Sequence, residues 1–421
     1  MKKILFFILK VFSKLVLKKY KPKVIGITGS VGKTTTKSAI DYVLKEKFKV
    51  RSSQDSFNNQ IGLPLTILGL ENSKSIFVWI KNILKAKRLI FFRDKNYPKI
   101  LVLEMGADRI GDIAYLNTIA PADIALLTEV APVHVEWFGS LDNIYKEKMD
   151  IFKGKQEQVC IINGDSEYLS KKNLNLKDKK VLTYGIEFNS DVKACDLEIK
   201  GVEGIEFTLC YKNEKEKIKM SNIYSLHSVY SVLGGVCVGL VMEMKLSEIK
   251  ERLRTLKLDK GRMSLVKGIK GTWIIDDSYN SSPLACRKAL KTFSEFETNN
   301  RKIAILGDML ELGEISEQEH KNIGKYVSDL SNITILITCG NEAKNINAGA
   351  IENGFDEKKL FNFENSEIAK KFIKKEIKQG DVILVKGSQG SRMEKIVKEI
   401  MLEPQKAKEL LVRQTGIWEK K

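Results

Sequence analysis

Short apolar runs alternate with longer amphipathic stretches along most of this chain. That alternation predicts parallel strands joined by crossover helices, and therefore an α/β fold with mostly parallel sheet. Val24–Thr28 reads as a buried strand, and Thr34–Phe48 as the helix that follows it. Further strands are predicted at Ile100–Glu104, Ile124–Thr128, Val159–Asn163 and Val181–Tyr184.

The pattern changes in the middle of the chain. In residues 192–219, short alternating runs are interrupted by Gly201 and Gly204, which predicts antiparallel hairpins. A buried helix rich in small residues is expected at Leu226–Met242, and a hinge at Lys257–Gly261.

A second α/β pattern follows this hinge. Its strands are predicted at Thr272–Asp276, Lys302–Gly307, Ile333–Thr338 and Val382–Lys386. We therefore place a domain boundary near residue 260, so that residues 1–23 form an N-terminal helix and residues 24–259 and 260–421 form two α/β domains.

The N-terminal segment is basic and amphipathic. Residues 1–23 carry eight lysines and no acidic residue. Lys10 and Lys14 interrupt the apolar run, so it falls short of the roughly 20 apolar residues of a spanning helix, and no small-residue cleavage site marks a signal peptide. A lysine stripe beside apolar residues is typical of a helix lying in a membrane interface. We expect residues 1–20 either to touch the inner face of the membrane or to dock on the protein's own core.

Composition narrows the class of protein. The chain has 421 residues, and 71 basic against 53 acidic side chains give a net charge of +18. The excess is mostly lysine, without an Arg/aromatic recognition motif, so we expect no nucleic-acid partner. The six scattered cysteines form no C-x-x-C pair, which predicts neither a zinc nor a redox site and fits a reduced, cytoplasmic compartment. We also expect a monomer.

The strongest chemical signal is the loop between the first strand and its helix. It reads Thr28-Gly29-Ser30-Val31-Gly32-Lys33-Thr34-Thr35. The glycines allow a tight turn whose N–H groups point at phosphate oxygens, and the helix N-terminus adds a favourable dipole. Lys33 would reach the β- and γ-phosphates of a nucleotide, and the Thr34 hydroxyl would hold Mg²⁺. Ile27 occupies the usual first glycine position, so the shorter G-x-x-G-K-T form is present; the alternative is a chance glycine turn.

Several later segments occur in a characteristic order with this loop. They are FNNQIGLPLTIL (57–68), LEMGA (103–107), TEVAPVHVEWFGSLDNIYKEKMDIF (128–152), INGDSE (162–167), GRM (261–263), DDSYNSSP (276–283), LGDMLELGE (306–314) and LVKGSQGSRME (384–394). Together with the loop they resemble the Mur ligase family. DDSYN-x-x-P and LGDM-x-ELG resemble the branch that adds D-alanyl-D-alanine to a UDP-muramoyl tripeptide.

The resemblance implies a P-loop ATPase domain followed by a Rossmann-like domain that closes over the nucleotide, with ATP and Mg²⁺ as cofactors. A carboxylate would attack the γ-phosphate, and an amine would then displace phosphate from the acyl phosphate. The implied metal ligands are Thr34 and Glu104 for one Mg²⁺, and His134 and Lys148 for a second. Lys148 would be carbamylated by CO₂; the alternative is a surface lysine in a lysine-rich helix.

The resemblance also implies a second wall of the site. Arg262 would reach the transferring phosphate from the hinge. Asp277, Tyr279, Asn280 and Lys386 would line the C-terminal face of the cleft, where Asn280 and Lys386 would also meet the substrate. His320 matches no such role, and we expect it on a helix surface.

Departures from the family pattern concern adenine recognition. Glu129 stands where the family usually has Asn, Ser228 and Ser231 stand in its H-N-x-x-N segment, and Ser282 replaces another Asn. Adenine binding is therefore expected to be weakened or rearranged. Only 23 residues precede the first strand, where the resembled branch has a domain that grips the UDP-sugar.

The leading hypothesis is an enzyme that adds D-Ala-D-Ala to a soluble or lipid-linked peptidoglycan precursor. One alternative is a related ligase with a γ-glutamyl or cell-surface polymer acceptor. Another is a nucleotide-binding protein without ligase chemistry, although such a protein has no need of a second set of metal ligands.

Overall fold

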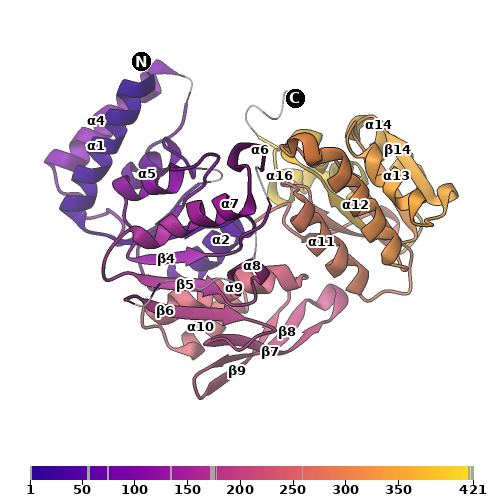
Figure 1. The fold of residues 1–421 in the computed structure, drawn as a ribbon, viewed down its shortest axis with the longest axis horizontal. Coiled ribbons are helices and arrows are strands. Elements are labelled where there is room, and N and C mark those ends of the chain that lie inside the picture. Colours follow the sequence, from indigo (N-terminus) through magenta and orange to yellow (C-terminus); the bar gives the residue numbers. More distant parts are fainter. Residues whose placement is uncertain are drawn as a thin grey trace.

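Two sheets, each flanked by helices, make up the molecule (Figure 1). The computed structural model describes residues 2–54, 57–73, 75–132, 135–170, 176, 178–257, 259–415 and 418. The first sheet has nine strands in the order β2-β3-β1-β4-β5-β6-β7-β8-β9, and the second has six in the order β10-β11-β15-β12-β13-β14. The chain is therefore α/β with large parallel sheets, as its apolar pattern predicts.

The first sheet is parallel from β2 to β7 and antiparallel beyond. Its strands are β1 (Lys23–Thr28), β2 (Val50–Ser52), β3 (Ile100–Glu104), β4 (Ile124–Leu127), β5 (Val159–Asn163), β6 (Lys180–Gly185), β7 (Val192–Ile199), β8 (Ile205–Tyr211) and β9 (Glu214–Met220). The predicted strands and the hairpins of residues 192–219 are confirmed. The central strands are apolar on both faces because helices cover both.

Two helical layers cover this sheet. Ile25 and Ile27 of β1 pack toward the layer of α2 (Lys33–Leu44), α9 (Leu226–Val241) and α10 (Leu246–Leu253). Val24 faces the opposite layer, since successive side chains of a strand point to opposite faces. That layer contains α1 (Lys2–Tyr20), α3 (Gly62–Leu68), α4 (Ile76–Phe91), α5 (Asp112–Ile119) and α7 (Leu141–Met149). Helix α2 ends four residues before the predicted end, and a turn continues to Phe48.

The second sheet begins with an antiparallel pair and is otherwise parallel. Its strands are β10 (Ser264–Lys267), β11 (Trp273–Asp277), β12 (Lys302–Gly307), β13 (Ile335–Cys339), β14 (Leu360–Phe363) and β15 (Val382–Lys386). One face packs against α11 (Pro283–Glu295), α12 (Ser316–Asp329) and α13 (Lys344–Glu352), and the other against α14 (Ser366–Glu376), α15 (Glu394–Ile400) and α16 (Ala407–Leu410). The four strands predicted here are confirmed to within two residues.

Helix α1 has two different faces. Leu9, Ser13 and Val16 are buried against the helical layer, so the alternative of a helix docked on the protein's own core is confirmed for this face. Ile4 and Phe7 on the outer face remain about two-thirds exposed, at 65% and 67%. Among the described residues, no helix combines the length and the apolar character that crossing a bilayer requires.

Candidate active site

The glycine loop joins the end of β1 to the start of α2. Gly29 has φ 146° and Gly32 has φ 87°, conformations that L side chains rarely adopt. A Cβ atom on Gly29 would lie 2.0 Å from the Thr128 hydroxyl oxygen, which itself donates to the Val31 carbonyl at 2.6 Å. Thr28 is buried, and its hydroxyl donates to the Met105 carbonyl at 2.8 Å. Gly29 is thus required by its backbone conformation and by its close packing on Thr128, which follows β4, and Gly32 by its backbone conformation alone.

Lys33 is the first residue of α2, and its amine folds back over the loop. Its Nζ donates to the Gly29 carbonyl at 2.7 Å. Burial lowers the pKa of this amine below its usual value, and the nearby Glu104 carboxylate partly opposes that effect. An anionic ligand in the loop would lie beside this half-buried amine and would favour its charged form.

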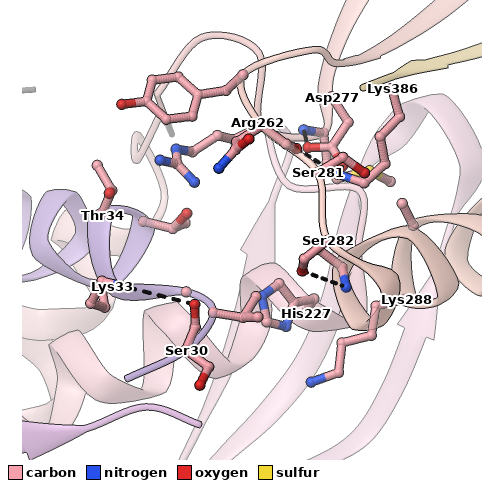
Figure 2. A pocket seen from close by; sticks show the side chains of 18 of the residues that line it. Ser30, Lys33, Thr34, His227, Arg262, Asp277, Ser281, Ser282, Lys288 and Lys386 are labelled. Carbon is pink, nitrogen blue, oxygen red and sulfur yellow. Dashed lines mark hydrogen bonds and ion pairs between the residues drawn. The ribbon is translucent and has the colours of Figure 1, made fainter. Parts of the chain in front are cut away.

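A cleft of about 410 Å³ opens between the loop and the C-terminal sheet (Figure 2). Twelve of the residues predicted from sequence line it: Ser30, Val31, Gly32, Lys33, Thr34, Thr35, Glu104, Arg262, Asp277, Tyr279, Asn280 and Lys386. Figure 2 shows Lys33 and Thr34 on one side and Asp277 and Lys386 on the other. Residues more than 200 positions apart in the sequence therefore share one cavity.

The wall opposite the loop is cationic and well ordered by contacts. Lys386 is buried, and its amine donates to the Asp277 carboxylate at 2.6 Å and to the Asn280 carbonyl at 3.0 Å. The guanidinium of Arg262 stacks over the Tyr279 ring, 4.0 Å from its centroid. The Arg262 Nε atom is buried without a hydrogen-bond partner in the described structure. The cleft thus presents cations from both walls, which suits a polyphosphate.

Glu104 ends β3 beside the glycine loop and has the features of a cation ligand. Its Oε1 accepts a hydrogen bond from Asn58 at 3.1 Å, whereas its Oε2 is buried and accepts none from the residues that the structure describes. Lys37 Nζ lies 3.6 Å from Oε2. This buried carboxylate lines the same cleft as Thr34, and carboxylate and hydroxyl oxygens are ligands that Mg²⁺ prefers.

Lys148 lies on α7 and does not line the cleft. Its side chain is 2% exposed, so the alternative of a surface lysine is wrong. Burial lowers its pKa to about 7, and the positive charge of Lys33 lowers it further, while Glu147 opposes both. Much of this amine is therefore neutral at neutral pH. His134 lies outside the described residues, and within those residues His, Cys, Asp and Glu side chains form no group of three that could hold a metal.

Comparison with known families decides the relationship. Residues 27–239 match the Mur ligase middle domain, and residues 261–389 match the Mur ligase glutamate ligase domain. The chain belongs to the Mur ligase family. Both matched segments contribute to the cleft, the first through the glycine loop and the second through Arg262 and Lys386.

Individual relatives of this Mur ligase agree with that assignment. The UDP-N-acetylmuramoyl-tripeptide--D-alanyl-D-alanine ligase of Bacillus subtilis is 31% identical over 94% of this chain and 79% of its own length. The crystal structure of the MurF ligase of Thermotoga maritima in complex with ADP is 27% identical, with a TM-score of 0.77, over 95% of this chain and 84% of the other. MurF of Acinetobacter baumannii, at 23% identity, shares the fold with a TM-score of 0.78 over 93% of this chain and 79% of its own.

Three of the four residues that depart from the family pattern, Glu129, Ser228 and Ser282, have hydrogen-bond partners in this Mur ligase. Glu129 accepts a hydrogen bond from the Ser166 hydroxyl and lies 3.3 Å from Lys288 Nζ. The Ser282 hydroxyl caps the N-terminus of α11 by accepting from the Ala285 N–H. Ser228 shares a 2.8 Å hydrogen bond with Ser225. These contacts stabilise the fold around the cleft.

His227 and Lys288 also line the cleft, although no role was predicted for either from the sequence. Burial, together with Lys288, Lys386 and Arg262, lowers the pKa of His227 to about 3, so its ring is neutral. Its place in the H-N-x-x-N segment was the available signal. Lys288 gave none, because it is one lysine among many in an amphipathic helix.

The expectation for His320 is wrong. This histidine is fully buried, and its Nε2 accepts a hydrogen bond from the Met309 N–H at 3.0 Å. Its Nδ1 must then carry the proton, and it donates to the Ser316 carbonyl at 2.7 Å. The ring thus ties α12 to the loop after β12, which supplies Leu310 and Glu311 to the cleft.

Proposed function

We propose that this Mur ligase joins a carboxylate of a muramoyl-peptide precursor of peptidoglycan to the amino group of D-Ala-D-Ala and converts ATP to ADP and phosphate. The observation that carries the proposal is the cleft in which the half-buried Lys33 of the glycine loop faces Arg262 and Lys386 of the other sheet. The names of the Bacillus subtilis and Thermotoga maritima relatives support this choice of substrates.

The reaction needs two steps because a carboxylate does not react with an amine in water at a useful rate. In the first, a carboxylate oxygen of the acceptor attacks the γ-phosphorus of ATP, the bond to the β-phosphate oxygen breaks, and ADP leaves. In the second, the amine of D-Ala-D-Ala attacks the carbonyl carbon of the acyl phosphate. Phosphate leaves with the former carboxylate oxygen, and the nitrogen loses a proton.

Charge neutralisation and alignment are the protein's main contributions to such a transfer. We assign Lys33 and the N–H groups of residues 29–35 to the β- and γ-phosphates. Arg262 would balance charge on the phosphate in transfer, and its stack on Tyr279 holds it over the cleft. Asp277 and Asn280 orient Lys386 through its two hydrogen bonds, and we assign Asn280 and Lys386 to the incoming substrate.

Thr34 and Glu104 would hold one Mg²⁺, and His134 and a carbamylated Lys148 a second. When bound, Mg²⁺ supplies positive charge to the phosphate oxygens during transfer. The open Oε2 of Glu104 supports the first assignment. The burial of Lys148 supports the second, because only a neutral amine can react with CO₂ to give a carbamate and a proton.

We further infer that residues 24–259 bind the nucleotide and that residues 260–421 close over it and present the amine. Because the reaction consumes ATP, and ATP is supplied in the cytoplasm, we infer that it takes place there. A monomer, with residues 1–20 in contact with the membrane, completes the proposal, and the exposed outer face of α1 supports that contact.

A substrate screen tests the proposed function. Purified protein is incubated with ATP, Mg²⁺, D-Ala-D-Ala and one candidate carboxylate at a time, and ADP release and the mass of the product are recorded. Candidates are a UDP-muramoyl tripeptide, a lipid-linked form of it, and γ-glutamyl peptides. ADP release that needs both D-Ala-D-Ala and a muramoyl peptide supports the proposal. Turnover with a γ-glutamyl peptide alone, or with no carboxylate, would overturn it.

A further inference from the structure

Helices α1 and α4 lie side by side at one edge of the molecule (Figure 1). Their C-terminal ends are joined: Lys19 Nζ donates to the Leu89 and Ile90 carbonyls at 3.0 and 2.8 Å. The Tyr20 hydroxyl contacts the Leu89 and Phe92 carbonyls at 3.2 and 3.1 Å. The two helices therefore form one rigid unit, held to the core by the buried side of α1.

The outer side of this unit exposes large apolar side chains. On α4, Phe77, Ile80, Leu84 and Phe91 follow one helical stripe and are 79%, 51%, 61% and 76% exposed. On α1, which packs beside α4, Ile4, Phe7 and Leu15 are also exposed, at 65%, 67% and 44%. We call these seven residues the α1–α4 face. An apolar surface of this kind marks an interaction site, because monomeric soluble proteins rarely expose so many large apolar side chains together.

The charges around the α1–α4 face are positive and therefore favour an anionic partner. The sequence of α1 holds six lysines, that of α4 holds three lysines and one arginine, and neither contains an acidic residue. Lys14 and Lys18 on α1, and Lys81 and Lys87 on α4, are exposed beside the apolar side chains. A second copy of the chain would bring like charges together. An anionic bilayer offers both an apolar interior and negative headgroups.

We propose that the α1–α4 face docks on an anionic lipid bilayer, with its apolar side chains in the interface and its lysines at the headgroups. This goes beyond contact through residues 1–20, because α4 supplies the larger part of the face. Removing α1 would also remove buried core, so α4 is the better place to test docking without unfolding the protein.

Docking brings the catalytic cleft close to the bilayer. Phe6 of α1 lines a second cavity of about 630 Å³, together with Arg109 and Trp137. Asn58, Asp108 and Glu311 line both this cavity and the nucleotide cleft. The second cavity thus adjoins the nucleotide cleft and is lined in part by α1. This step rests on the proposed function. The position of the two adjoining cavities suits an acceptor peptide whose muramoyl end is attached to a membrane-anchored carrier.

Flotation with vesicles tests the docking. Full-length protein is mixed with vesicles of equal parts phosphatidylglycerol and phosphatidylcholine, or of phosphatidylcholine alone, at low and high salt. The test variant is Phe77→Ser/Phe91→Ser, and the matched control is Ile368→Ser on α14, which is 50% exposed. We expect wild type and control to float with anionic vesicles at low salt and less at high salt, and the double variant to bind about tenfold more weakly.

Wild type that stays in solution with anionic vesicles would overturn the docking, as would a double variant that floats like wild type with an unchanged unfolding temperature. Concentration-dependent dimers of wild type that disappear in the double variant would overturn it in favour of a second copy. Ligation of a soluble UDP-linked acceptor without vesicles should be equal in wild type and double variant. Flotation without any ligation would sink the proposed function and leave the docking standing.

Discussion

Lys288 on α11 lies 3.3 Å from Glu129, which follows the end of β4, so an ion pair connects the two α/β parts of the chain beside the cleft that Lys288 lines. The two side chains are 30% and 11% exposed. Glu129 is also one of the positions where this chain departs from the family pattern. The pair holds together the two walls between which a nucleotide must fit, and this predicts a role in closing the cleft.

Lys288→Gln and Glu129→Gln should each raise the KM for ATP by about two- to fivefold, with a smaller change in kcat, because a partly exposed ion pair contributes about 0.5–1 kcal/mol. The double variant should be no worse than the poorer single variant. The measurement is a double-mutant cycle on kcat/KM for ATP. If the two single effects simply add, the residues act independently and the predicted closure role is wrong.

Lys33→Ala should reduce ADP release about a thousandfold or more, because it removes the charge that balances the β- and γ-phosphates in a buried site. The unfolding temperature should stay close to that of wild type. Lys45→Ala, at the opposite end of α2 and exposed, is the matched control and should retain turnover. Unchanged ADP release in Lys33→Ala would refute the assignment of the glycine loop.

Lys148→Ala should be nearly inactive while still folding, because it removes the nitrogen that would carry the carbamate. Lys146→Ala, exposed on the same helix, should behave like wild type. Wild-type turnover should fall when CO₂ is stripped from the buffer and recover on addition of bicarbonate. An active enzyme whose Lys148 remains a plain amine in a crystal structure with Mg²⁺ would contradict the proposal.

Asp276 on β11 gives the stability of the protein a definite pH dependence. Burial raises its pKa to about 7 from the ordinary value of 3.8. The folded chain therefore keeps this proton where the unfolded chain has lost it, and the free energy of unfolding falls as pH rises from about 4 to about 7.

Asp276→Asn should remove this loss. It keeps the oxygen that accepts from the Ser278 N–H, but it carries no charge to bury. We expect its unfolding temperature to exceed that of wild type by several degrees at pH 8, because a shift of about three pKa units corresponds to at most about 4 kcal/mol, and to match wild type at pH 5. The measurement is the unfolding temperature of both proteins at pH 5 and pH 8. An equal difference between variant and wild type at both pH values would mean that packing, and not the buried charge, causes the effect.

Local pattern predicted much of this fold. The strands at Ile100–Glu104, Val159–Asn163 and Val382–Lys386 agree with the structure because continuous apolar runs bounded by polar residues specify buried parallel strands. The glycine loop and its helix could be predicted because the spacing of the motif is set by the tight turn that its glycines allow.

Contacts between distant segments could not be predicted in the same way. Lys288 and Glu129 are 159 positions apart and have no local signal. The burial of His320 depends on how α12 packs against a neighbouring loop, which its helical periodicity does not reveal. The sequence of residues 1–20 fits both of its alternatives, because the inner face of helix α1 is core while its outer face is exposed.

In the proposed reaction, ATP activates the acceptor carboxylate as an acyl phosphate. The most direct test supplies a muramoyl-peptide acceptor whose reacting carboxylate carries oxygen-18 in both positions, with ATP, Mg²⁺ and D-Ala-D-Ala. Mass spectrometry then follows the label into phosphate and product. Activation as an acyl phosphate predicts one labelled oxygen in each phosphate released and one in the new amide. Unlabelled phosphate, or label found in AMP, would contradict it.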